Sequence, residues 1–241
     1  AGLRVLMKLR KLAGKSIQIV NVSQEVYNIL EVTGFIELFD VKKALREISV
    51  EGCEFIGSGG YGRVYWLDPE TIVKLYNPGL SLEFVERERE ISQRAFLMGV
   101  PTAISYDVVK CGESYGVVYE MLNAKTIAQI IDKEPGKIQE LCKESANLLK
   151  KLHKITPGPD AGLPDRKKYL LQWAESMTDK LPEAESEKLL AFIRGIPEHN
   201  TFLHGDYNSK NIMVRDGEFQ LIDIGDAAIG HPMFDIAGLM L

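Results

Sequence analysis

The sequence lacks the features that mark a secreted or membrane protein. Its three cysteines, Cys53, Cys111 and Cys142, show no short-range pairing pattern, and an odd number of scattered cysteines favours reduced thiols over a disulfide framework. No apolar run approaches the roughly 20 residues that a membrane-spanning helix needs, and no segment has the pattern of a signal peptide. We therefore expect a cytoplasmic protein with no membrane partner.

The chain also lacks an excess of positive charge. It holds 29 lysines and arginines against 34 acidic residues, for a formal net charge of −5. Because nucleic-acid binding concentrates positive charge on one face of a protein, we expect no nucleic-acid partner. The 241 residues, 45% of them hydrophobic and 26% charged, are typical of a globular protein with one large domain or a domain plus a smaller one.

The first 50 residues alternate between helix and strand patterns. Leucine at every third position from Leu3 to Leu12 predicts a helix, which Gly14 ends. The β-branched run 17–22 predicts a strand, Ser23 caps a second helix, and 35–41 predicts another strand. This β–α–β order indicates a parallel sheet.

Beyond residue 50 strand patterns dominate, interrupted by one charged helix over 82–98. From Thr126 onward helix patterns prevail, and a hairpin with an Asp216-Gly217 turn follows them. A β-rich lobe followed by a helical lobe predicts an α+β fold of two lobes with a ligand cleft between them. We divide the chain into residues 1–49, 50–122 and 123–241.

Residues 57–64 read Gly-Ser-Gly-Gly-Tyr-Gly-Arg-Val and match the pattern G-x-G-x-x-G-x-V. A glycine triplet alone is also typical of a flexible surface turn. A dinucleotide-binding turn would lead from a strand into a helix, whereas strand patterns lie on both sides here, as in the kinase loop that covers nucleotide phosphates. Backbone N–H groups approach phosphates closely where side chains are missing. The nucleotide contacts that we expect from this loop are Gly57, Ser58, Gly59, Gly60, Gly62 and Val64.

Lys74 lies in an apolar strand pattern that follows the glycine loop. An unpaired lysine in such a strand is costly to bury, so it needs an anion, whereas on an edge strand it would face water. After the glycine loop we favour a lysine that binds nucleotide phosphates and pairs with a glutamate of the next helix. Glu88 shares an apolar helix face with Phe84 and Ile91 and is our choice, with Glu90 second.

The segment 204–211 reads His-Gly-Asp-Tyr-Asn-Ser-Lys-Asn, and Asp223 follows Asn211 by twelve residues. Phosphoryl transfer needs a carboxylate that orients or deprotonates the attacking hydroxyl, a role that fits Asp206. It also needs oxygen ligands for Mg²⁺, which fit Asn211 and Asp223. The alternative, a coincidental polar loop, would not be expected to follow a glycine loop and a lysine in this order. The sequence thus predicts ATP and Mg²⁺ as cofactors.

The segment around Asp206 resembles the H-G-D-x-x-x-x-N loop of the aminoglycoside phosphotransferase and choline kinase family, which has a protein-kinase-like fold. Residues 221–227 and 235–237 are similar to that family's metal-binding segment and its following helix. The resemblance covers the chain from about residue 54 to its end. It implies that the backbone of Glu120 and Leu122 binds adenine between the lobes.

The chain departs from the pattern of that family without losing a catalytic group. Asn208, Ser209 and Lys210 replace a common His-Pro-Gly, and His231 replaces a frequent acidic residue. We therefore expect an active enzyme. The helices that usually shape the acceptor site in this family lie beyond the end of this chain, so the resemblance does not identify the acceptor.

Residues 1–48 resemble the second half of a STAS domain, the fold of anti-sigma-factor antagonists. The resemblance rests on residues 1–4, which are similar to a helix start in that fold, and on the segments 20–23 and 30–35. Half of such a sheet would leave an apolar face uncovered, so we expect the chain to be a fragment at both ends. The alternative is an N-terminal extension that packs on the first lobe.

Two functions fit these observations. The first is an ATP- and Mg²⁺-dependent phosphotransferase that acts on a hydroxyl group of a small molecule. The second is a regulatory module in which the STAS-like segment docks a regulatory protein, while the kinase-like part phosphorylates a protein serine or senses nucleotide. Intact Lys74, Asp206, Asn211 and Asp223 favour catalysis over sensing, whereas the STAS-like segment favours regulation over drug resistance.

Overall fold

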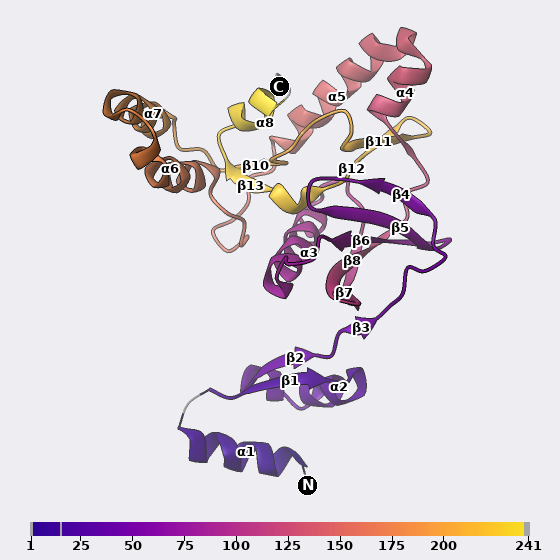
Figure 1. Cartoon of the computed structure of the whole chain (residues 1–241), viewed down its shortest axis with the longest axis vertical. Helices are drawn as coiled ribbons and strands as arrows, with labels where there is room; N and C mark the ends of the chain where they lie inside the picture. Colours follow the sequence, from indigo (N-terminus) through magenta and orange to yellow (C-terminus); the bar gives the residue numbers. More distant parts are fainter. Residues whose placement is uncertain (1, 15, 239–241) are drawn as a thin grey trace.

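The computed structural model of the chain describes residues 2–14 and 16–238 (Figure 1). Ala1, at the start of the predicted first helix, lies outside this part. An N-terminal α/β segment, a β-rich lobe and a largely helical lobe follow one another along the chain. In the described part, no helix is long and apolar enough to cross a membrane.

The N-terminal segment contains a small parallel sheet. Its elements, in chain order, are α1 (Gly2–Ala13), β1 (Gln18–Val22), α2 (Gln24–Val32) and β2 (Asp40–Lys43). β1 pairs with β2 in parallel, which confirms the predicted arrangement. The strand predicted over 35–41 is wrong in its first half, because Gly34 takes a left-handed conformation (φ 72°) and residues 35–37 then form a 3-10 helix.

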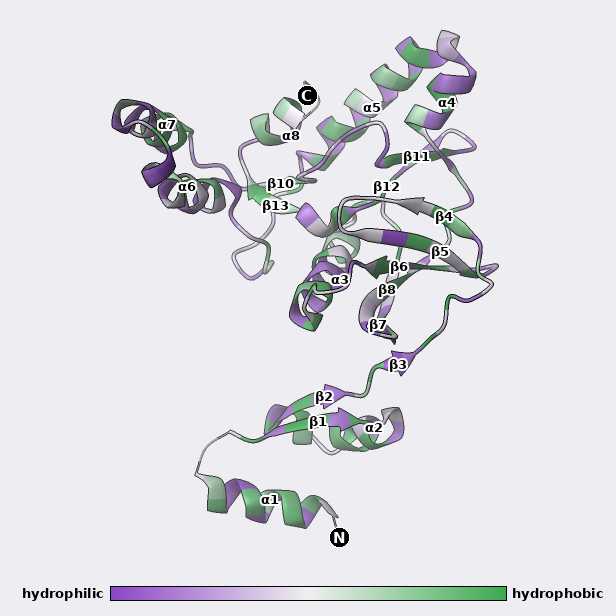
Figure 2. Ribbon diagram, viewed as in Figure 1, coloured by the Kyte–Doolittle hydropathy of each residue, from purple (hydrophilic) through white to green (hydrophobic). Residues whose placement is uncertain are grey.

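Few large apolar side chains of this segment are buried. Val22, Leu30 and Phe39 are its buried hydrophobic residues among those described, and α1 has no buried residue. Leu12 of α1 and Val32 of α2 are 85% and 87% exposed. Figure 2 shows hydrophobic residues along both helices. A two-stranded sheet has too little surface to cover two helices.

The first lobe is a six-stranded sheet in the order β3-β7-β8-β6-β5-β4. Its strands are β3 (Arg46–Glu47), β4 (Phe55–Ser58), β5 (Gly62–Asp68), β6 (Thr71–Tyr76), β7 (Ser105–Cys111) and β8 (Ser114–Glu120). The helix α3 (Leu82–Leu97) is capped by Ser81 and packs on this sheet through Val85. β3 pairs in parallel with β7, so a strand from before residue 50 already belongs to the sheet.

The second lobe is mostly helical. Its elements are β9 (Lys125–Thr126), α4 (Ile127–Lys133), α5 (Ile138–Leu152), α6 (Arg166–Ser176), α7 (Glu183–Gly195), β10 (Thr201–Leu203), β11 (Ile212–Arg215), β12 (Glu218–Leu221), β13 (Ala228–Gly230) and α8 (Met233–Gly238). The predicted hairpin is confirmed as β11 and β12, with Asp216 and Gly217 both at positive φ in the turn.

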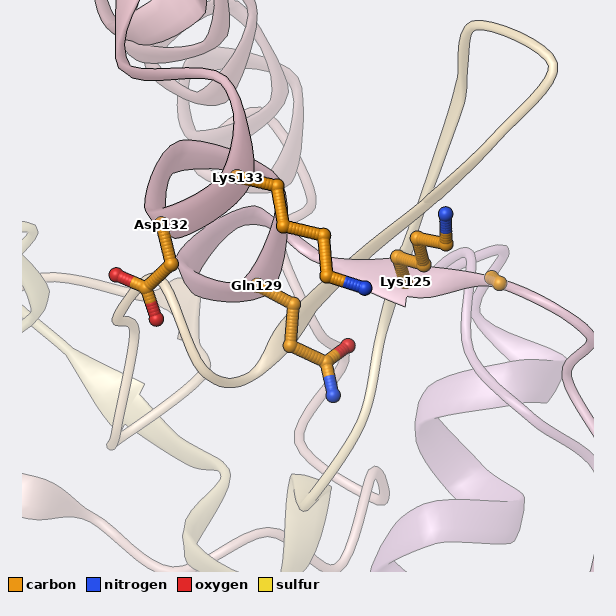
Figure 3. Close-up of a pocket in the computed structure, with 5 residues that line it drawn as sticks. Lys125, Gln129, Asp132 and Lys133 are labelled. Carbon is orange, nitrogen blue, oxygen red and sulfur yellow. The ribbon is translucent and has the colours of Figure 1, made fainter.

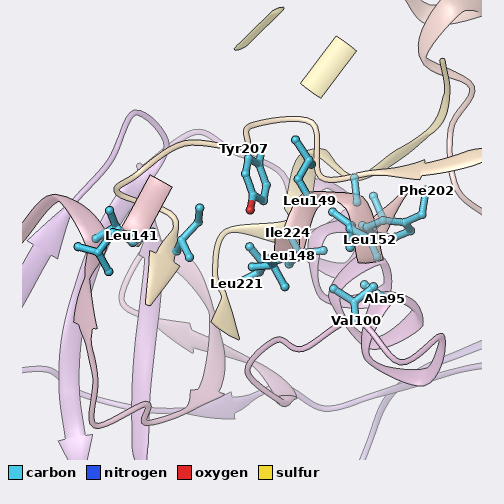
Figure 4. Packing of buried hydrophobic residues seen from close by; sticks show 14 residues of the cluster. Ala95, Val100, Leu141, Leu148, Leu149, Leu152, Phe202, Tyr207, Leu221 and Ile224 are labelled. Atoms are coloured by element: carbon cyan, nitrogen blue, oxygen red, sulfur yellow. The ribbon is translucent and has the colours of Figure 1, made fainter. Parts of the chain in front are cut away.

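The main hydrophobic core joins the two lobes (Figure 4). Leu148, Leu149 and Leu152 of α5 belong to it together with Ala95 at the end of α3. Leu221 of β12 lies in the same cluster. Full burial of a leucine side chain contributes about 1.5–3 kcal/mol. Because Ala95 packs among these leucines, α3 is anchored at one end in the second lobe while it packs along the sheet of the first.

Candidate active site

β6 and α3 bring Lys74 and Glu88 together in the first lobe. The Nζ atom of Lys74 lies 3.5 Å from Oε2 of Glu88 and 2.6 Å from Oδ1 of Asp223, which belongs to the second lobe. Of the two glutamates considered from the sequence, Glu88 is the one beside Lys74. Glu90 points elsewhere and pairs with Arg94 on the exposed side of α3 at 3.7 Å.

Opposing effects set the charge state of this cluster. Burial lowers the pKa of Lys74, but the Asp223 and Glu88 carboxylates outweigh it and raise the pKa above its ordinary value. Burial raises the pKa of Glu88, and the Lys74 ammonium offsets only part of that increase. The ammonium therefore stays charged at neutral pH and is available to an anionic ligand.

Two asparagine amides hold the carboxylate of Asp206. Nδ2 of Asn211 donates to Oδ2 of Asp206 at 2.7 Å, and Nδ2 of Asn208 donates to Oδ1 at 2.9 Å. The side-chain oxygen of Asn208 also accepts the N–H of Lys210 at 2.9 Å, which closes the turn. Asn208 was not among the predicted site residues, because in the sequence it is only a departure from a family pattern.

The backbone of Ile222 connects the loop of Asp206 to the segment of Asp223. Its N–H donates to the carbonyl of Asn211 at 3.0 Å, and its carbonyl lies 3.1 Å from Nε2 of His204. Nδ1 of His204 accepts the N–H of Asp206 at 3.2 Å, so the proton of the ring belongs on Nε2. Burial lowers the pKa of His204 and favours this neutral ring.

A buried carboxylate holds the start of the same loop. Asp235 is 1% exposed, and it accepts the N–H of His204 at 3.0 Å and that of Gly205 at 2.9 Å. Nε2 of His153 lies 2.9 Å from the same carboxylate. Gly205 has a φ of +86°, and a Cβ there would lie 2.1 Å from the carbonyl oxygen of Asp226. Asp235 therefore fixes the start of the loop. The sequence carried no direct signal for this role.

Asp223 adopts a backbone conformation that is uncommon for residues other than glycine, and Gly225 has no room for a side chain. Asp223 is left-handed, with φ 60° and ψ 50°, so its side chain turns toward Lys74 directly after β12. A Cβ on Gly225 would lie 2.4 Å from Oε1 of Glu88. The glycine thus lets α3 approach the segment that carries Asp223.

The donor set of Asn211 and Asp223 fits a magnesium ion that arrives with a nucleotide. Because Nδ2 of Asn211 donates to Asp206, its Oδ1 is the atom left for a metal. Within residues 2–14 and 16–238 no group of three or more His, Cys, Asp and Glu side chains could hold a metal. Mg²⁺ does not need such a group, since one or two protein oxygens, phosphates and water complete its shell.

The glycine-rich loop is a strand–turn–strand, as predicted. The N–H of Gly59 donates to the carbonyl of Gly62 at 3.0 Å across the turn between β4 and β5. No described atom lies within 4 Å of the Cβ positions of Gly57, Gly59 and Gly60, so the backbone there is open to a ligand.

Gly62 differs, because its Cβ would lie 2.1 Å from the carbonyl oxygen of Leu75 in β6. Gly62 is therefore needed for strand packing. Val64 pairs directly with Lys74 across β5 and β6.

The connection between the lobes runs through residues 120–124. The N–H of Glu120 donates to Ile104 at 2.9 Å and that of Met121 to Glu70 at 2.8 Å, whereas the N–H of Leu122 donates to no acceptor in the described part of the chain. A cavity of about 370 Å³ lies beside the end of this connection (Figure 3). None of the predicted site residues lines it. It is lined by Ala124, Lys125, Gln129, Asp132 and Lys133.

Comparisons with known proteins relate the chain to phosphotransferases. A model described as the phosphotransferase enzyme family matches residues 52–241, and no curated protein sequence gives a match. A solved apo structure, a thermostable mutant of aminoglycoside phosphotransferase APH(4)-Ia, superposes with a TM-score of 0.57 at 12% identity, over 77% of this chain and 70% of that chain.

Two further solved structures are similar to the chain at comparable levels. Aminoglycoside-3′-phosphotransferase of type VIII gives a TM-score of 0.55 at 20% identity, over 78% of this chain and 77% of that chain. Aminoglycoside phosphotransferase APH(3″)-Id from Streptomyces rimosus, in complex with ADP and streptomycin, gives 0.55 at 17% identity, over 78% and 76%. At these identities the structures share a fold with the chain, which confirms the predicted two-lobe α+β architecture.

Proposed function

The chain belongs to the phosphotransferase enzyme family, and on that basis we propose that it transfers the γ-phosphoryl group of ATP, with Mg²⁺, to a hydroxyl group of a small molecule. The observation that carries the proposal is the convergence of Lys74, Glu88 and Asp223 from two lobes. The loop that carries Asp206 is hydrogen-bonded through Asn211 and His204 to Ile222, the residue before Asp223.

ATP would lie between the lobes. The open glycines of the β4–β5 turn would cover its phosphates, and the Lys74 ammonium would bind them while Glu88 keeps the lysine in place. The N–H of Leu122 and the carbonyl of Glu120 would bind adenine. The solved relatives support a nucleotide as the ligand, because one is bound to AMP-PNP and another to ADP.

Asp206 would act on the acceptor. Its carboxylate orients the hydroxyl group and accepts its proton as the new oxygen–phosphorus bond forms and the bond from the γ-phosphorus to the β–γ bridging oxygen breaks, which releases ADP. The amides of Asn208 and Asn211 keep the carboxylate in one rotamer for this step. Mg²⁺, held by Asn211 and Asp223, would neutralise charge on the phosphates.

The class of acceptor follows from relatives rather than from a pocket in this chain. One solved relative is bound to hygromycin B and another to streptomycin, which supports a small molecule with hydroxyl groups. The regulatory alternative gains no support from the comparisons, since the family match begins at residue 52. The STAS-like interpretation of residues 1–48 stays a prediction.

The test is ADP release from Mg·ATP in the presence of candidate acceptors. The panel contains amino-sugars, amino-alcohols, sugars and a STAS-domain protein, and Asp206→Asn serves as the blank. We expect one small molecule to stimulate release well above that blank. Release or label transfer only with the STAS-domain protein, or none above the blank despite ATP binding, would contradict the proposal.

A further inference from the structure

Tyr76 contacts both members of the Lys74–Glu88 pair. Its hydroxyl donates to Oε2 of Glu88, and the Lys74 ammonium lies 5.1 Å from the centre of its ring. Lys74 itself is closer to Asp223, at 2.6 Å, than to Glu88, at 3.5 Å. The most direct hydrogen bond to Glu88 therefore comes from Tyr76 and not from the lysine.

The same side chain lies between α3, the sheet and the glycine-rich turn. The ring of Phe84 packs on the ring of Tyr76 with centroids 5.9 Å apart, and on that of Tyr61 in the turn at 5.7 Å. Tyr119 of β8 packs against the same buried cluster as Tyr76. These contacts place Tyr76 at the centre of a polar network within the lobe.

Because the network is buried, each of its polar groups depends on its hydrogen-bond partner for stability. Tyr76 is 2% exposed and Glu88 7% exposed. A buried hydroxyl or carboxylate that loses its partner keeps its full desolvation cost, so the network strongly favours one arrangement. Gly225 lies against the other oxygen of Glu88, which leaves the carboxylate little room to move.

We propose that Tyr76 is a positioning residue: its hydroxyl holds Glu88, and through Glu88 the helix α3, in the docked position before any nucleotide binds. Neither the family match nor a sequence motif assigns a role to Tyr76. The functional meaning of this position rests on the proposed roles of Lys74 and Glu88 as phosphate-binding groups. The docking of α3 itself does not, and can be measured without activity.

The first experiment measures hydrogen exchange of the α3 amides in the nucleotide-free protein. Tyr76→Phe keeps the ring, and with it the contacts to Phe84 and Lys74, but removes the hydroxyl. We expect exchange in Leu82–Leu97 to become about tenfold faster, as for the loss of a hydrogen bond to a charged group. Tyr115→Phe is the matched control, because Tyr115 packs on the same cluster and its hydroxyl has no hydrogen bond in the described part of the chain.

Unchanged exchange in Tyr76→Phe would overturn the proposal, and so would an equal acceleration in Tyr115→Phe. The second experiment measures Mg·ATP affinity by calorimetry in a double-mutant cycle of Tyr76→Phe and Glu88→Ala, which removes the acceptor. If Tyr76 acts through Glu88, Tyr76→Phe weakens binding about tenfold in the wild-type background and at most about twofold beside Glu88→Ala. Additive losses would contradict this. A wild-type chain that binds no Mg·ATP would count against the proposed function, while hydrogen exchange would still decide the role of Tyr76.

Discussion

The site between the lobes buries charged and polar side chains, whereas the N-terminal segment exposes apolar ones. Around Lys74 the chain buries charged and polar groups, and no buried side-chain nitrogen or oxygen in the described part lacks a partner. Residues 2–43 instead expose apolar side chains such as Val32 and bury few. Buried polar groups with fixed partners are costly to change, whereas exposed apolar groups contribute little to stability. We therefore expect sensitivity to substitution to be concentrated in the site.

The link between the two regions is also weak. Besides the chain connection through β3, it includes the ion pair of Lys42 with Glu86 at 3.9 Å. Exposed pairs of this kind contribute about 0–1 kcal/mol each. The comparison predicts that small changes in the site have large effects and that a large change in the N-terminal segment has a small one.

The largest effect is expected from Asp206→Asn. The variant keeps the shape of the side chain and removes the carboxylate that orients and deprotonates the acceptor, so turnover should fall about 10²- to 10⁴-fold. Nucleotide affinity should stay nearly unchanged. Steady-state ADP release and Mg·ATP calorimetry check both expectations. Normal turnover would show that the carboxylate is not in the reaction.

Asp223→Ala should weaken Mg²⁺-dependent ATP binding. It removes a proposed metal ligand and the carboxylate 2.6 Å from Lys74, and loss of a charge-assisted contact of this kind costs about 1.5–3 kcal/mol, or roughly ten- to a hundredfold in affinity. Calorimetry with and without Mg²⁺ is the measurement. The same affinity as wild type would place the metal elsewhere.

Gly225→Ala should lower the free energy of unfolding by about 1–3 kcal/mol, because the new Cβ has to displace a carboxylate that is held in place. The contact is 2.4 Å, to Oε1 of Glu88. Gly59→Ala is the matched control, since no described atom lies near its Cβ position, and we expect its stability to lie within about 0.5 kcal/mol of wild type. Urea denaturation of both variants decides whether α3 packs as closely as the structure indicates.

The buried ring of His204 should make stability depend on pH. Its pKa is lowered by burial from an ordinary value of 6.5, so below that value the unfolded chain binds a proton that the folded chain does not. Stability contributed by the neutral ring is therefore present above about pH 6.5 and is lost as pH falls toward the folded pKa, by at most about 1.4 kcal/mol per pH unit. Denaturation at pH 7.5 and 5.5 should show a smaller difference in His204→Asn than in wild type. An equal difference in His204→Asn and in wild type would contradict this expectation.

The smallest effect is expected from deleting residues 1–44. The deletion removes most of the N-terminal segment but leaves β3 in the sheet, so Mg·ATP affinity should stay within about twofold of wild type. Calorimetry on the shortened chain measures this. A loss of affinity as large as that of Asp223→Ala would contradict this expectation and show that the N-terminal segment supports the site.

Much of the site could be predicted because its chemistry is local in sequence. The glycine turn, the hairpin with Asp216-Gly217 and the spacing of Asp206 and Asn211 are short patterns with their own physical causes. Helical periodicity was enough to choose Glu88 over Glu90, since only one face of α3 can meet the sheet. The strand predicted at residue 35 failed because a single left-handed glycine redirected the chain.

The sequence by itself thus determined the order of the lobes, the two-lobe fold and the residue types that can bind phosphates, because periodicity and turn chemistry act over a few residues. Only the tertiary structure decided which groups share a hydrogen bond. Tyr76 with Glu88, Asn208 with Asp206 and Asp235 with the loop at Gly205 join residues on separate elements or across a folded turn. The physical reason is that a buried polar group takes whatever partner packing leaves within reach, and packing is a property of the whole chain.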